Sequence, residues 1–463
     1  MTESTREPSS AAAEPGRSTL VGVATGTPDG GVAIVRLSGP EAMTITARVL
    51  GGRRLPAPRR LARRSLMLRG GGSPESAQED ALVVVMPGPR SFTGEDVVEL
   101  HVHAGARNVR QVVDALLASG ATAAGPGAFS RRAFELGRLD LEQAEGIAAL
   151  IAARTDAALA QARRLVAGEL GRGVEALREQ VAGLRGEIEA NLDFPEDVSD
   201  SDTRRWLSEL AELRAVIGRW LRRFEAGRRA RELARVALAG PPNAGKSSLF
   251  NALVQRDRSI VSPRPGTTRD YVEAELELGA HGAVLIDTAG LRGASEDAIE
   301  LEGISRTREQ LDGADIVLWV EAADAEPRAE VELEVEEGSL VIRVENKRDL
   351  GCARPDWLGV SARTGEGIEE LRARLARWFT GVDRDADDAP WIGLARHRDR
   401  ATDAFAALEA CVERINDGAP LELIAFELGV AERRLAEITG RYALGAFGGD
   451  VLERIFSRFC IGK

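Results

Sequence analysis

Residues 240–247 read G-P-P-N-A-G-K-S and match the pattern G-x-x-x-x-G-K-[ST]. The apolar run Val236–Ala239 precedes them and the helix-forming sequence SLFNALV follows, which gives the order of strand, loop and helix that this pattern requires. In such a loop, glycines turn backbone N–H groups towards phosphates, Lys246 neutralises the outer phosphates, and the Ser247 hydroxyl ligates Mg²⁺. The segment therefore predicts a P-loop within an α/β fold.

The use of lysine points to the same loop. The chain has three lysines, Lys246, Lys347 and Lys463, against fifty-eight arginines. A compact ammonium on a flexible stem suits a phosphate-cradling loop, whereas the planar guanidinium binds carboxylates and phosphates through a bidentate fork. Lys246 and Lys347 therefore mark functional segments, and chance is the alternative explanation for Lys463.

Four further motifs follow the P-loop in order. They are G-T-T-R-D at 266–270, D-T-A-G at 287–290 after the apolar run AVLI, N-K-R-D at 346–349 after SLVIRV, and S-A-R at 361–363. Together the motifs resemble the complete set found in GTPases, which is far more specific than any single motif. We therefore expect an α/β P-loop GTPase domain of the Ras-like type.

Each motif predicts a separate contact with the nucleotide. Thr268 is expected to complete the coordination of Mg²⁺ with Ser247, and Asp287 to hold the water shell of the metal. Asn346 and Asp349 predict guanine, because a carboxylate that accepts two guanine N–H groups would lose those bonds with adenine. The predicted GTP-binding residues are Asn243, Ala244, Gly245, Lys246, Ser247, Ser248, Ser262, Pro263, Arg264, Pro265, Gly266, Thr267, Thr268, Asp287, Thr288, Ala289, Gly290, Asn346, Lys347, Asp349, Ser361, Ala362 and Arg363.

The residue after D-T-A-G is Leu291, where Ras-type GTPases place the glutamine that orients the attacking water. Leucine cannot orient water, so another group must act. Glu300 is our catalytic candidate, and the alternative is a solvated acid in a switch region. The side-chain carbonyl of Asn243 could hold a monovalent cation beside the phosphates, which would replace an arginine finger electrostatically. Arg292 and Arg269 are alternatives for that role.

The length of 463 residues allows about three domains at roughly 150 residues each. Residues 1–18 are rich in Ser, Pro, Ala and Glu and predict a disordered tail. Residues 19–136 alternate strand-like runs with loops and predict an α+β domain. Apolar spacing of three and four residues predicts amphipathic helices over 137–232 and 382–463. These two parts are expected to form one helical domain, into which the GTPase domain, residues 233–381, is inserted.

Composition restricts the partners and the compartment. The sequence has no signal-peptide pattern and no apolar run of membrane length, which predicts a cytoplasmic protein without a membrane partner. Cys352, Cys411 and Cys460 lack the spacing of a disulfide framework or a zinc site. The net charge is −12, and eight carboxylates fall within 321–337. A run of arginines is interpreted as a solvated loop, with RNA contact as the alternative; it comprises Arg53, Arg54, Arg59, Arg60, Arg63, Arg64 and Arg69.

Beyond the GTPase motifs, several segments resemble one family. They are ATGTPDGGVAIVRLSG, PGPRSFTGEDVVELHVHAG, GPGAFSRRAFELGRLDLEQAEGIAALI and the terminal FCIGK. With the GTPase motifs they cover nearly the whole chain and resemble the tRNA modification GTPase family MnmE, also called TrmE. A GTPase set alone would indicate only some G protein, whereas the flanking segments and the terminal C-x-G-K make the resemblance specific.

This resemblance implies a homodimer whose amino-terminal domains bind a one-carbon tetrahydrofolate, the 5-formyl or 5,10-methylene form. It implies G domains that approach each other when GTP and K⁺ bind. It also implies a complex, a heterotetramer or larger, with the FAD-containing flavoprotein MnmG, in which FAD belongs only to the partner. Such proteins add an aminomethyl or carboxymethylaminomethyl group to C5 of the wobble uridine in certain tRNAs.

The motif match also assigns residues. It implies folate contacts for Arg36, Glu99, Arg138 and Lys463, K⁺ binding by Asn243, Ser262, Arg264 and Thr267, and a role in hydrolysis for Glu300. The family typically has lysine at the position of Arg138 and often threonine at that of Ser262.

The folate assignments are consistent with the chemistry of the ligand. A folate has a glutamate tail that needs cations and a pterin ring whose two N–H groups suit a carboxylate such as Glu99. Arg36 and Glu99 could instead be ordinary surface charges of strands, and Arg138 an ordinary ion pair at the start of a helix. Cys460 could be a nucleophile or one-carbon carrier, or a buried structural cysteine.

Two other functions fit the GTPase motifs. One is a GTP-dependent switch in ribosome assembly, and the other is a helical scaffold whose GTPase regulates docking of partners. A ribosome-binding GTPase should carry a basic RNA-binding module after its G domain, whereas residues 383–463 have the mixed charge of amphipathic helices. The sequence therefore favours the tRNA-modifying enzyme.

Overall fold

The computed structural model describes residues 18–25, 30–68, 78–193, 200–231, 233–254, 272–287, 313–325, 339–351, 354–380, 392–440, 449–457 and 459. The chain divides into two compact units. The first comprises Met1–Ala148, Leu165–Asp197 and Ala419–Lys463, and the second comprises Ala149–Arg164 and Val198–Gly418. Residues 1–17 of the predicted tail lie outside the described residues.

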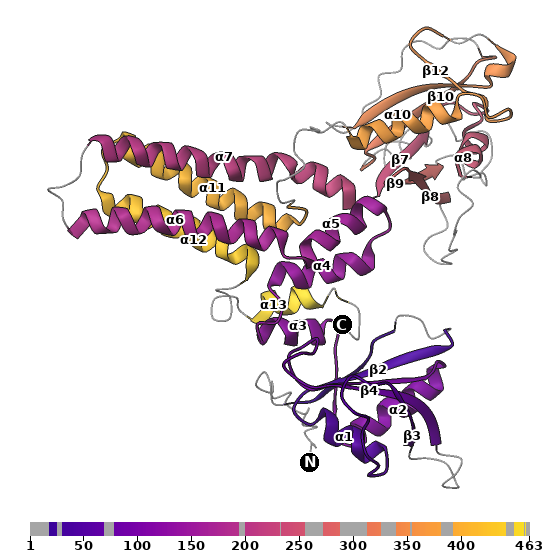
Figure 1. Ribbon diagram of the computed structural model, residues 1–463. Coiled ribbons are helices and arrows are strands. Elements are labelled where there is room, and N and C mark those ends of the chain that lie inside the picture. Colours follow the sequence, from indigo (N-terminus) through magenta and orange to yellow (C-terminus); the bar gives the residue numbers. More distant parts are fainter. Residues whose placement is uncertain are drawn as a thin grey trace, which may run out of the picture. The chain divides into compact units, whose positions relative to one another are not determined.

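The first unit contains a six-stranded sheet of order β3-β4-β5-β2-β1-β6 (Figure 1). Helices α1 and α2 pack on one face, where Val35, Leu100 and Leu116 belong to a fully buried core. Apart from the parallel pair β1–β6, the paired strands are antiparallel. The elements are β1 (Leu20–Val23), β2 (Val32–Ser38), α1 (Ala42–Val49), β3 (Ala62–Met67), β4 (Gln78–Met86), β5 (Val97–His103), α2 (Ala106–Ala118) and β6 (Thr122–Ala123).

Period-two alternation in β2 and β5 separates this core from the opposite face of the sheet. Val35 and Leu37 point into the core, so Arg36 between them lies on the other face. Glu99 is the direct cross-strand partner of Arg36 and is placed on that face by the same alternation. The sequence pattern thus brings two predicted folate residues together although they are 63 positions apart.

The helices of the first unit join segments from both ends of the chain. Helix α6 packs along α12, and Arg178 of α6 forms an ion pair of 2.8 Å with Glu432 of α12. A separate apolar cluster brings Phe134 and Leu141 together with Phe456. The helices are α3 (Ala128–Glu135), α4 (Leu141–Ala152), whose first part lies in this unit, α6 (Glu169–Asp193), α12 (Leu421–Thr439) and α13 (Gly449–Phe456).

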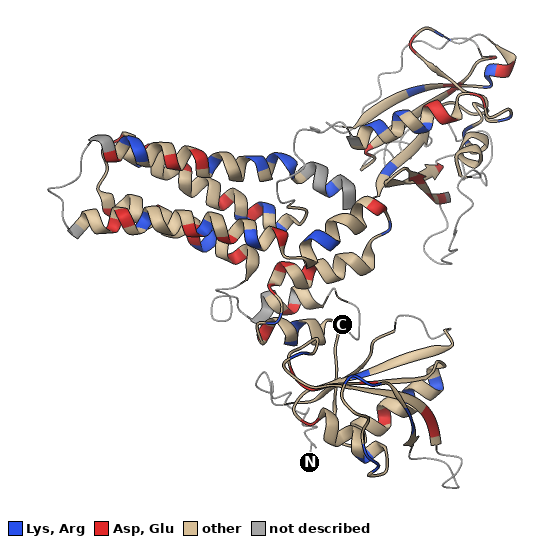
Figure 2. Cartoon of the chain, in the orientation of Figure 1, with Lys and Arg blue, Asp and Glu red and all other residues tan. Residues whose placement is uncertain are grey.

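In the second unit, α7 (Asp200–Arg231) packs along α11 (Ala395–Asn416). Their contact includes an ion pair of 2.8 Å between Arg214 and Glu409, and Trp206 and Trp220 of α7 are buried. Acidic and basic residues are interspersed along the long helices of both units (Figure 2), as the mixed-charge pattern predicts. Helix α5 (Asp156–Val166) also lies mostly in this unit.

The second unit contains another six-stranded sheet, of order β12-β11-β10-β7-β9-β8. Among the strands described in this sheet, β8 and β9 pair antiparallel and the other pairs are parallel. Helices α8 and α10 bury Leu249 and Leu371 against one face of the sheet. The alternate strand residues, among them Ala237 and Val317, form a smaller apolar cluster on the opposite face. The elements are β7 (Ala234–Ala239), α8 (Lys246–Val254), β8 (Val272–Leu278), β9 (His281–Asp287), β10 (Ile316–Ala322), β11 (Leu340–Asn346), the 3₁₀ turn η3 (Arg348–Leu350), β12 (Leu358–Gly359) and α10 (Ile368–Thr380).

The architecture is multidomain, with an α+β part, long helices and an α/β part, as expected. The division into two units cuts across the predicted helical domain, because α6 and α12 fall in the first unit and α7 and α11 in the second. The exact domain boundaries therefore stay predictions. Among the helices that the structure describes, none has the length and apolarity needed to cross a membrane. Within the arginine run, Arg53, Arg54, Arg59 and Arg60 are exposed in the loop before β3, as predicted. The loop prediction is wrong for Arg63 and Arg64, which lie in strand β3, where Arg63 pairs with Asp80 of β4.

Candidate functional site

The first site residues lie at the carboxyl end of β7, where the strand order of the second sheet reverses, the usual ligand position in open α/β sheets. Gly240 has φ 138°, and a Cβ there would lie 2.1 Å from the carbonyl oxygen of Val320. Gly245 has φ 85°, and its Cβ would lie 2.4 Å from Nδ2 of Asn346. Both positions therefore require glycine. Lys246 Nζ donates to the carbonyl oxygens of Gly240 at 2.7 Å and Pro241 at 2.8 Å, so its ammonium lies across the loop.

Asn346, the last residue of β11, ties the P-loop to the S-A-R segment. Its Nδ2 donates to the carbonyl oxygens of Ala244 at 3.0 Å and Gly245 at 3.2 Å. Its Oδ1 accepts a hydrogen bond of 3.1 Å from the backbone N–H of Ala362. The side chain is 2% exposed, so a buried amide with these partners fixes three separate segments relative to one another.

Asp349 lies in the turn η3 and is held from the S-A-R segment. The Ser361 hydroxyl donates to Oδ1 at 2.6 Å, and the Arg363 guanidinium donates to Oδ2 at 2.6 Å. The hydrogen bond from Ser361 and the charge of Arg363 lower the pKa of the Asp349 carboxyl below its ordinary value. The group is therefore ionised at neutral pH. A carboxylate has about four acceptor positions, which leaves Asp349 able to accept further N–H groups.

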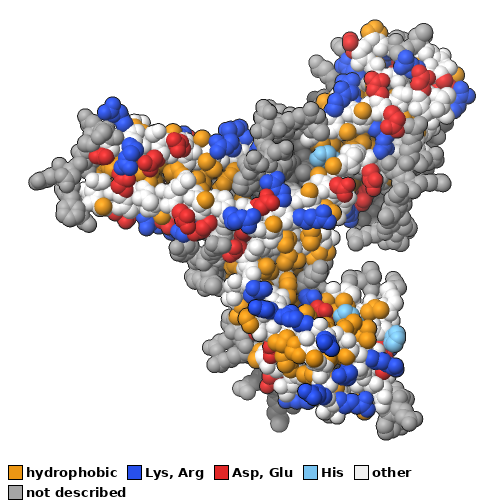
Figure 3. All heavy atoms as spheres, in the orientation of Figure 1, with side chains coloured by type: hydrophobic (Ala, Val, Ile, Leu, Met, Phe, Trp, Pro, Cys, Tyr) orange, Lys and Arg blue, Asp and Glu red, His pale blue; other side chains and the backbone are white. Residues whose placement is uncertain are grey.

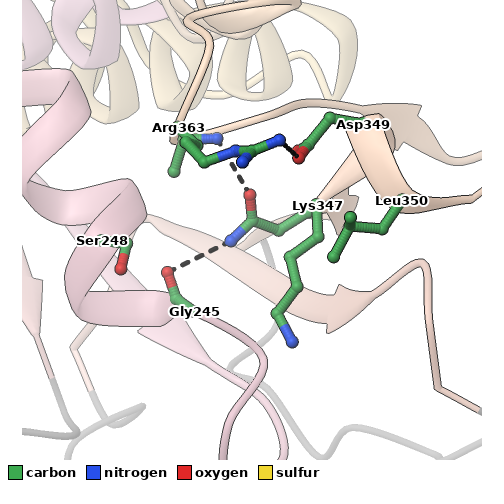
Figure 4. Close-up of a pocket in the computed structure, with 8 residues that line it drawn as sticks. Gly245, Ser248, Lys347, Asp349, Leu350 and Arg363 are labelled. Atoms are coloured by element: carbon green, nitrogen blue, oxygen red, sulfur yellow. Dashed lines mark hydrogen bonds and ion pairs between the residues drawn. The ribbon is translucent and has the colours of Figure 1, made fainter.

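These residues line a cavity of about 220 Å³ (Figure 4). This volume is below the ~300–1,000 Å³ typical of pockets that hold a whole drug-sized ligand, and it suits one part of a nucleotide, the base. In the close-up, Arg363 points towards Asp349, and Lys347 lies beside them. The lining residues are Gly245, Ser248, Asn346, Lys347, Asp349, Leu350, Ala362 and Arg363.

Lys347 has a partner that the sequence did not indicate. Its Nζ lies 3.2 Å from Oδ1 of Asp324, just after β10. Asp324 belongs to the acidic stretch 321–337, whose composition gave no signal for a specific contact. Lys347 has φ 62°, a left-handed conformation uncommon for residues other than glycine, which directs the chain into η3 immediately after Asn346.

The other predicted nucleotide residues are only partly described. Ser247 is exposed in the first turn of α8, and Asp287 is buried at the end of β9. Within the described ranges there is no cluster of three or more His, Cys, Asp or Glu that could hold a metal. The predicted residues Ser262, Pro263, Arg264, Pro265, Gly266, Thr267, Thr268, Thr288, Ala289, Gly290, Glu300, Cys460 and Lys463 lie outside the described residues.

In the first unit, Arg36 and Glu99 form an ion pair. Arg36 donates to Glu99 Oε1 from Nε at 2.9 Å and from a terminal nitrogen at 2.7 Å, and the side chains are 17% and 15% exposed. The other oxygen, Oε2, lies 3.6 Å from His101 Nε2. The Arg36 guanidinium also lies 5.4 Å from the ring centre of Phe92 and 5.7 Å from that of Phe129, within cation–π range.

Arg138 lies next to the loop that carries Phe92. Its guanidinium donates to the carbonyl oxygen of Ser91 at 3.4 Å, and its stem fills the space beside Gly94, where a Cβ would be 2.9 Å from Cγ of Arg138. The segment 91–94 thus contacts both Arg36 and Arg138. The structure brings together three of the four predicted folate residues along this segment.

Comparisons with known proteins identify the family of the chain. The family model "GTP-binding protein TrmE N-terminus" matches residues 19–138, and "MnmE helical domain" matches residues 141–460. A tRNA modification GTPase MnmE of Halorhodospira halophila (strain DSM 244 / SL1) is 43% identical, covering 96% of this chain and 96% of the relative. The protein of the same name from Methylobacterium sp. (strain 4-46) is 41% identical, covering 96% of this chain and 99% of the relative. The solved G domain of the T. maritima FeoB iron transporter is 26% identical, covering 32% of this chain and 99% of that chain with a TM-score of 0.23. From the two family matches and the near full-length relatives, the chain belongs to the MnmE family of tRNA modification GTPases.

Proposed function

We propose that this chain binds and hydrolyses GTP and, with a flavoprotein partner, adds an aminomethyl or carboxymethylaminomethyl group to C5 of the wobble uridine of certain tRNAs. The observation that carries the GTP part is the placement of Asn346. Its hydrogen bonds join the P-loop to the segment that holds Asp349. Gly245 at the end of the P-loop and Asp349 thus line one cavity, which would hold the guanine base. Family membership favours tRNA modification over a switch in ribosome assembly.

The residues at the P-loop fit a nucleotide with Mg²⁺. Hydroxyl and carboxylate oxygens are the ligands that Mg²⁺ prefers, and it usually keeps waters and substrate phosphates as its remaining ligands. Ser247 presents an exposed hydroxyl at the start of α8, where helical N–H groups favour phosphate. Asp287 supplies a carboxylate at the end of the neighbouring strand β9. Ser247 and Thr268 would ligate the ion, which would offset the charge of the phosphates.

The folate part of the proposal rests on Arg36 and Glu99. Glu99 Oε1 is held by Arg36, which orients the carboxylate on the sheet face opposite α1 and α2. A pterin ring could donate two N–H groups to this carboxylate, while Arg138 and Lys463 would bind the glutamate tail. Large apolar side chains are exposed on the same face of the sheet, among them Val32 at 58% and Leu82 at 43%.

That exposed apolar surface also supports the proposed homodimer. Hydrophobic side chains gather on the visible surface of the amino-terminal sheet region (Figure 3), and such patches commonly mark interfaces. A second copy covering this surface would exclude water from the Arg36–Glu99 pair. The flavoprotein, in a heterotetramer or larger complex, would supply FAD for the redox chemistry of the modification.

K⁺ should activate hydrolysis through Asn243. Asn243 has φ 62° within the P-loop, and its side-chain carbonyl would join Ser262, Arg264 and Thr267 in holding the ion, whose charge stabilises the transition state. GTP turnover should rise at least about tenfold when Na⁺ is replaced by K⁺, because one electrostatic stabiliser contributes ~2.7–4 kcal/mol in other enzymes. Asn243→Ala should remove that difference. Equal turnover of the unmodified protein in both salts would contradict the cation site.

Glu300 should act in hydrolysis rather than in binding. The glutamine position of Ras-type GTPases is occupied by Leu291, so another group must orient or activate the water, and the Glu300 carboxylate is suited to that role. Glu300→Ala should bind a fluorescent GDP analogue with unchanged affinity and hydrolyse GTP roughly 100-fold more slowly, the lower range for a positioned acid–base group. The neighbouring Glu302→Ala is the matched control and should keep its activity. A Glu300→Ala variant with normal turnover would exclude this role.

A further inference from the structure

Arg354 connects two buried glutamates on neighbouring strands. Glu321 of β10 is 6% exposed and Glu345 of β11 is 1% exposed. The Arg354 Nε lies 3.1 Å from Glu345 Oε1, and a terminal nitrogen of the same guanidinium donates to Glu321 Oε2. Buried carboxylates are costly unless they are paired and hydrogen-bonded. The guanidinium is therefore a structural requirement at this point of the sheet.

The contacts around Arg354 leave it little freedom. Its backbone N–H donates to Glu345 Oε2 at 3.0 Å, so Glu345 holds both the main chain and the side chain. Trp319 Nε1 donates to Glu321 Oε1 at 3.1 Å, and the Arg354 guanidinium lies 4.8 Å from the ring centre of Trp357. A planar fork can satisfy this geometry and an ammonium cannot.

This network closes the loop that carries Asp349. Glu345 directly precedes Asn346, and its carbonyl oxygen accepts a hydrogen bond of 2.7 Å from the N–H of Val360. The chain between them leaves β11 through η3, passes Arg354 and returns as β12, which pairs with β11. Asp349 thus lies between two anchors, the Glu345–Arg354 contact on one side and Ser361 on the other.

We propose that Arg354 is a positioning residue for guanine recognition, acting by holding the Asp349 turn against β11. The inference rests on the proposed GTP function and deepens it, because it assigns base selectivity to a residue outside the five motifs. Arg354 does not line the cavity. It acts on the base only through the turn, and its loss should reduce the contacts that Asp349 makes while leaving the phosphate contacts of the P-loop in place.

The test compares GDP with inosine diphosphate, IDP, whose base lacks the exocyclic amino group that donates one of the two hydrogen bonds to Asp349. Dissociation constants are measured for both nucleotides with the full-length chain. Arg354→Met should lower the preference for GDP over IDP by about tenfold, which corresponds to ~1.4 kcal/mol. General loss of stability would weaken both nucleotides equally and leave the ratio unchanged, so the ratio separates positioning from a merely structural role.

Arg374→Met is the matched control, since Arg374 is exposed on α10 of the same unit, and its ratio should equal that of the unmodified protein. If Arg354→Met fails to fold, Arg354→Lys is tested in its place. Lysine keeps the positive charge but lacks the planar guanidinium, so the preference for GDP over IDP should also fall. An unchanged ratio in a folded Arg354 variant would overturn the proposal while the GTP function stands. An unmodified chain without preference for GDP over IDP would instead refute the GTP function itself.

Discussion

The Asp349→Asn variant should bind guanine nucleotides much more weakly, and xanthine nucleotides more tightly, than the unmodified protein. The Asp349 carboxylate is ionised and keeps acceptor capacity beyond its bonds to Ser361 and Arg363. Two hydrogen bonds to a charged acceptor contribute about 1.5–3 kcal/mol each, so the affinity for GDP should fall by roughly 100- to 10,000-fold. Xanthine carries an oxygen in place of the exocyclic amino group of guanine. The amide of the variant can donate to that oxygen, and the affinity for xanthosine diphosphate should rise.

The measurement is direct calorimetric titration of GDP and of xanthosine diphosphate into the unmodified protein and into the variant. Asp356→Asn is the matched control, because Asp356 is exposed in the same loop and has φ 66°, a conformation that asparagine tolerates. That variant should bind GDP as the unmodified protein does. If Asp349→Asn kept its preference for GDP, the base would have to be recognised elsewhere.

The second large effect is expected at the folate site. Glu99→Gln should weaken binding of 5-formyltetrahydrofolate by at least about 30-fold, since loss of one charge from a hydrogen-bonded pair costs ~2–5 kcal/mol and a pterin would meet an amide in place of a carboxylate. GDP affinity should stay unchanged because the two sites lie in different units. Calorimetric titration measures both ligands on the same preparation.

Glu79→Gln is the matched control for this experiment. Glu79 is a similarly buried carboxylate of the same sheet, but it binds His103 at 2.9 Å rather than Arg36. Its loss should leave folate binding intact. Equal weakening in both variants would show that the sheet, rather than a specific acceptor, was disturbed, and no binding to the unmodified protein would remove the folate from the account.

The local parts of this molecule could be predicted from sequence, and the tertiary contacts could not. The P-loop and the helical spacing are local patterns, so the strand β7 and the helix α8 appear where Gly240–Ser247 requires them. The predicted guanine contact of Asp349 follows from a motif as well. The bond from Asn346 to Ala244 spans 102 positions and depends on strand order, which no local pattern encodes.

The sequence also did not predict which charged residues are buried. The acidic composition of 321–337 gave no reason to expect Glu321 to be buried, because charged residues are rarely buried unless paired. Its partner Arg354 lies 33 positions away, outside every motif. The ion pair of Arg36 with Glu99 is similar, since the resemblance implied that each contacts folate and the sheet register makes them direct partners.

The most direct test of the whole account is reconstitution of the modification. The chain is combined with the flavoprotein partner of the same organism, unmodified tRNA, 5,10-methylenetetrahydrofolate, GTP, Mg²⁺ and K⁺. Ammonium or glycine is added in separate reactions as the nitrogen donor, and the tRNA nucleosides are analysed by mass spectrometry. A C5-substituted wobble uridine should form with GTP, and should be absent when GDP replaces GTP or when Lys246→Ala replaces the unmodified chain. Wobble uridine that stays unmodified while GTP is hydrolysed would contradict the account.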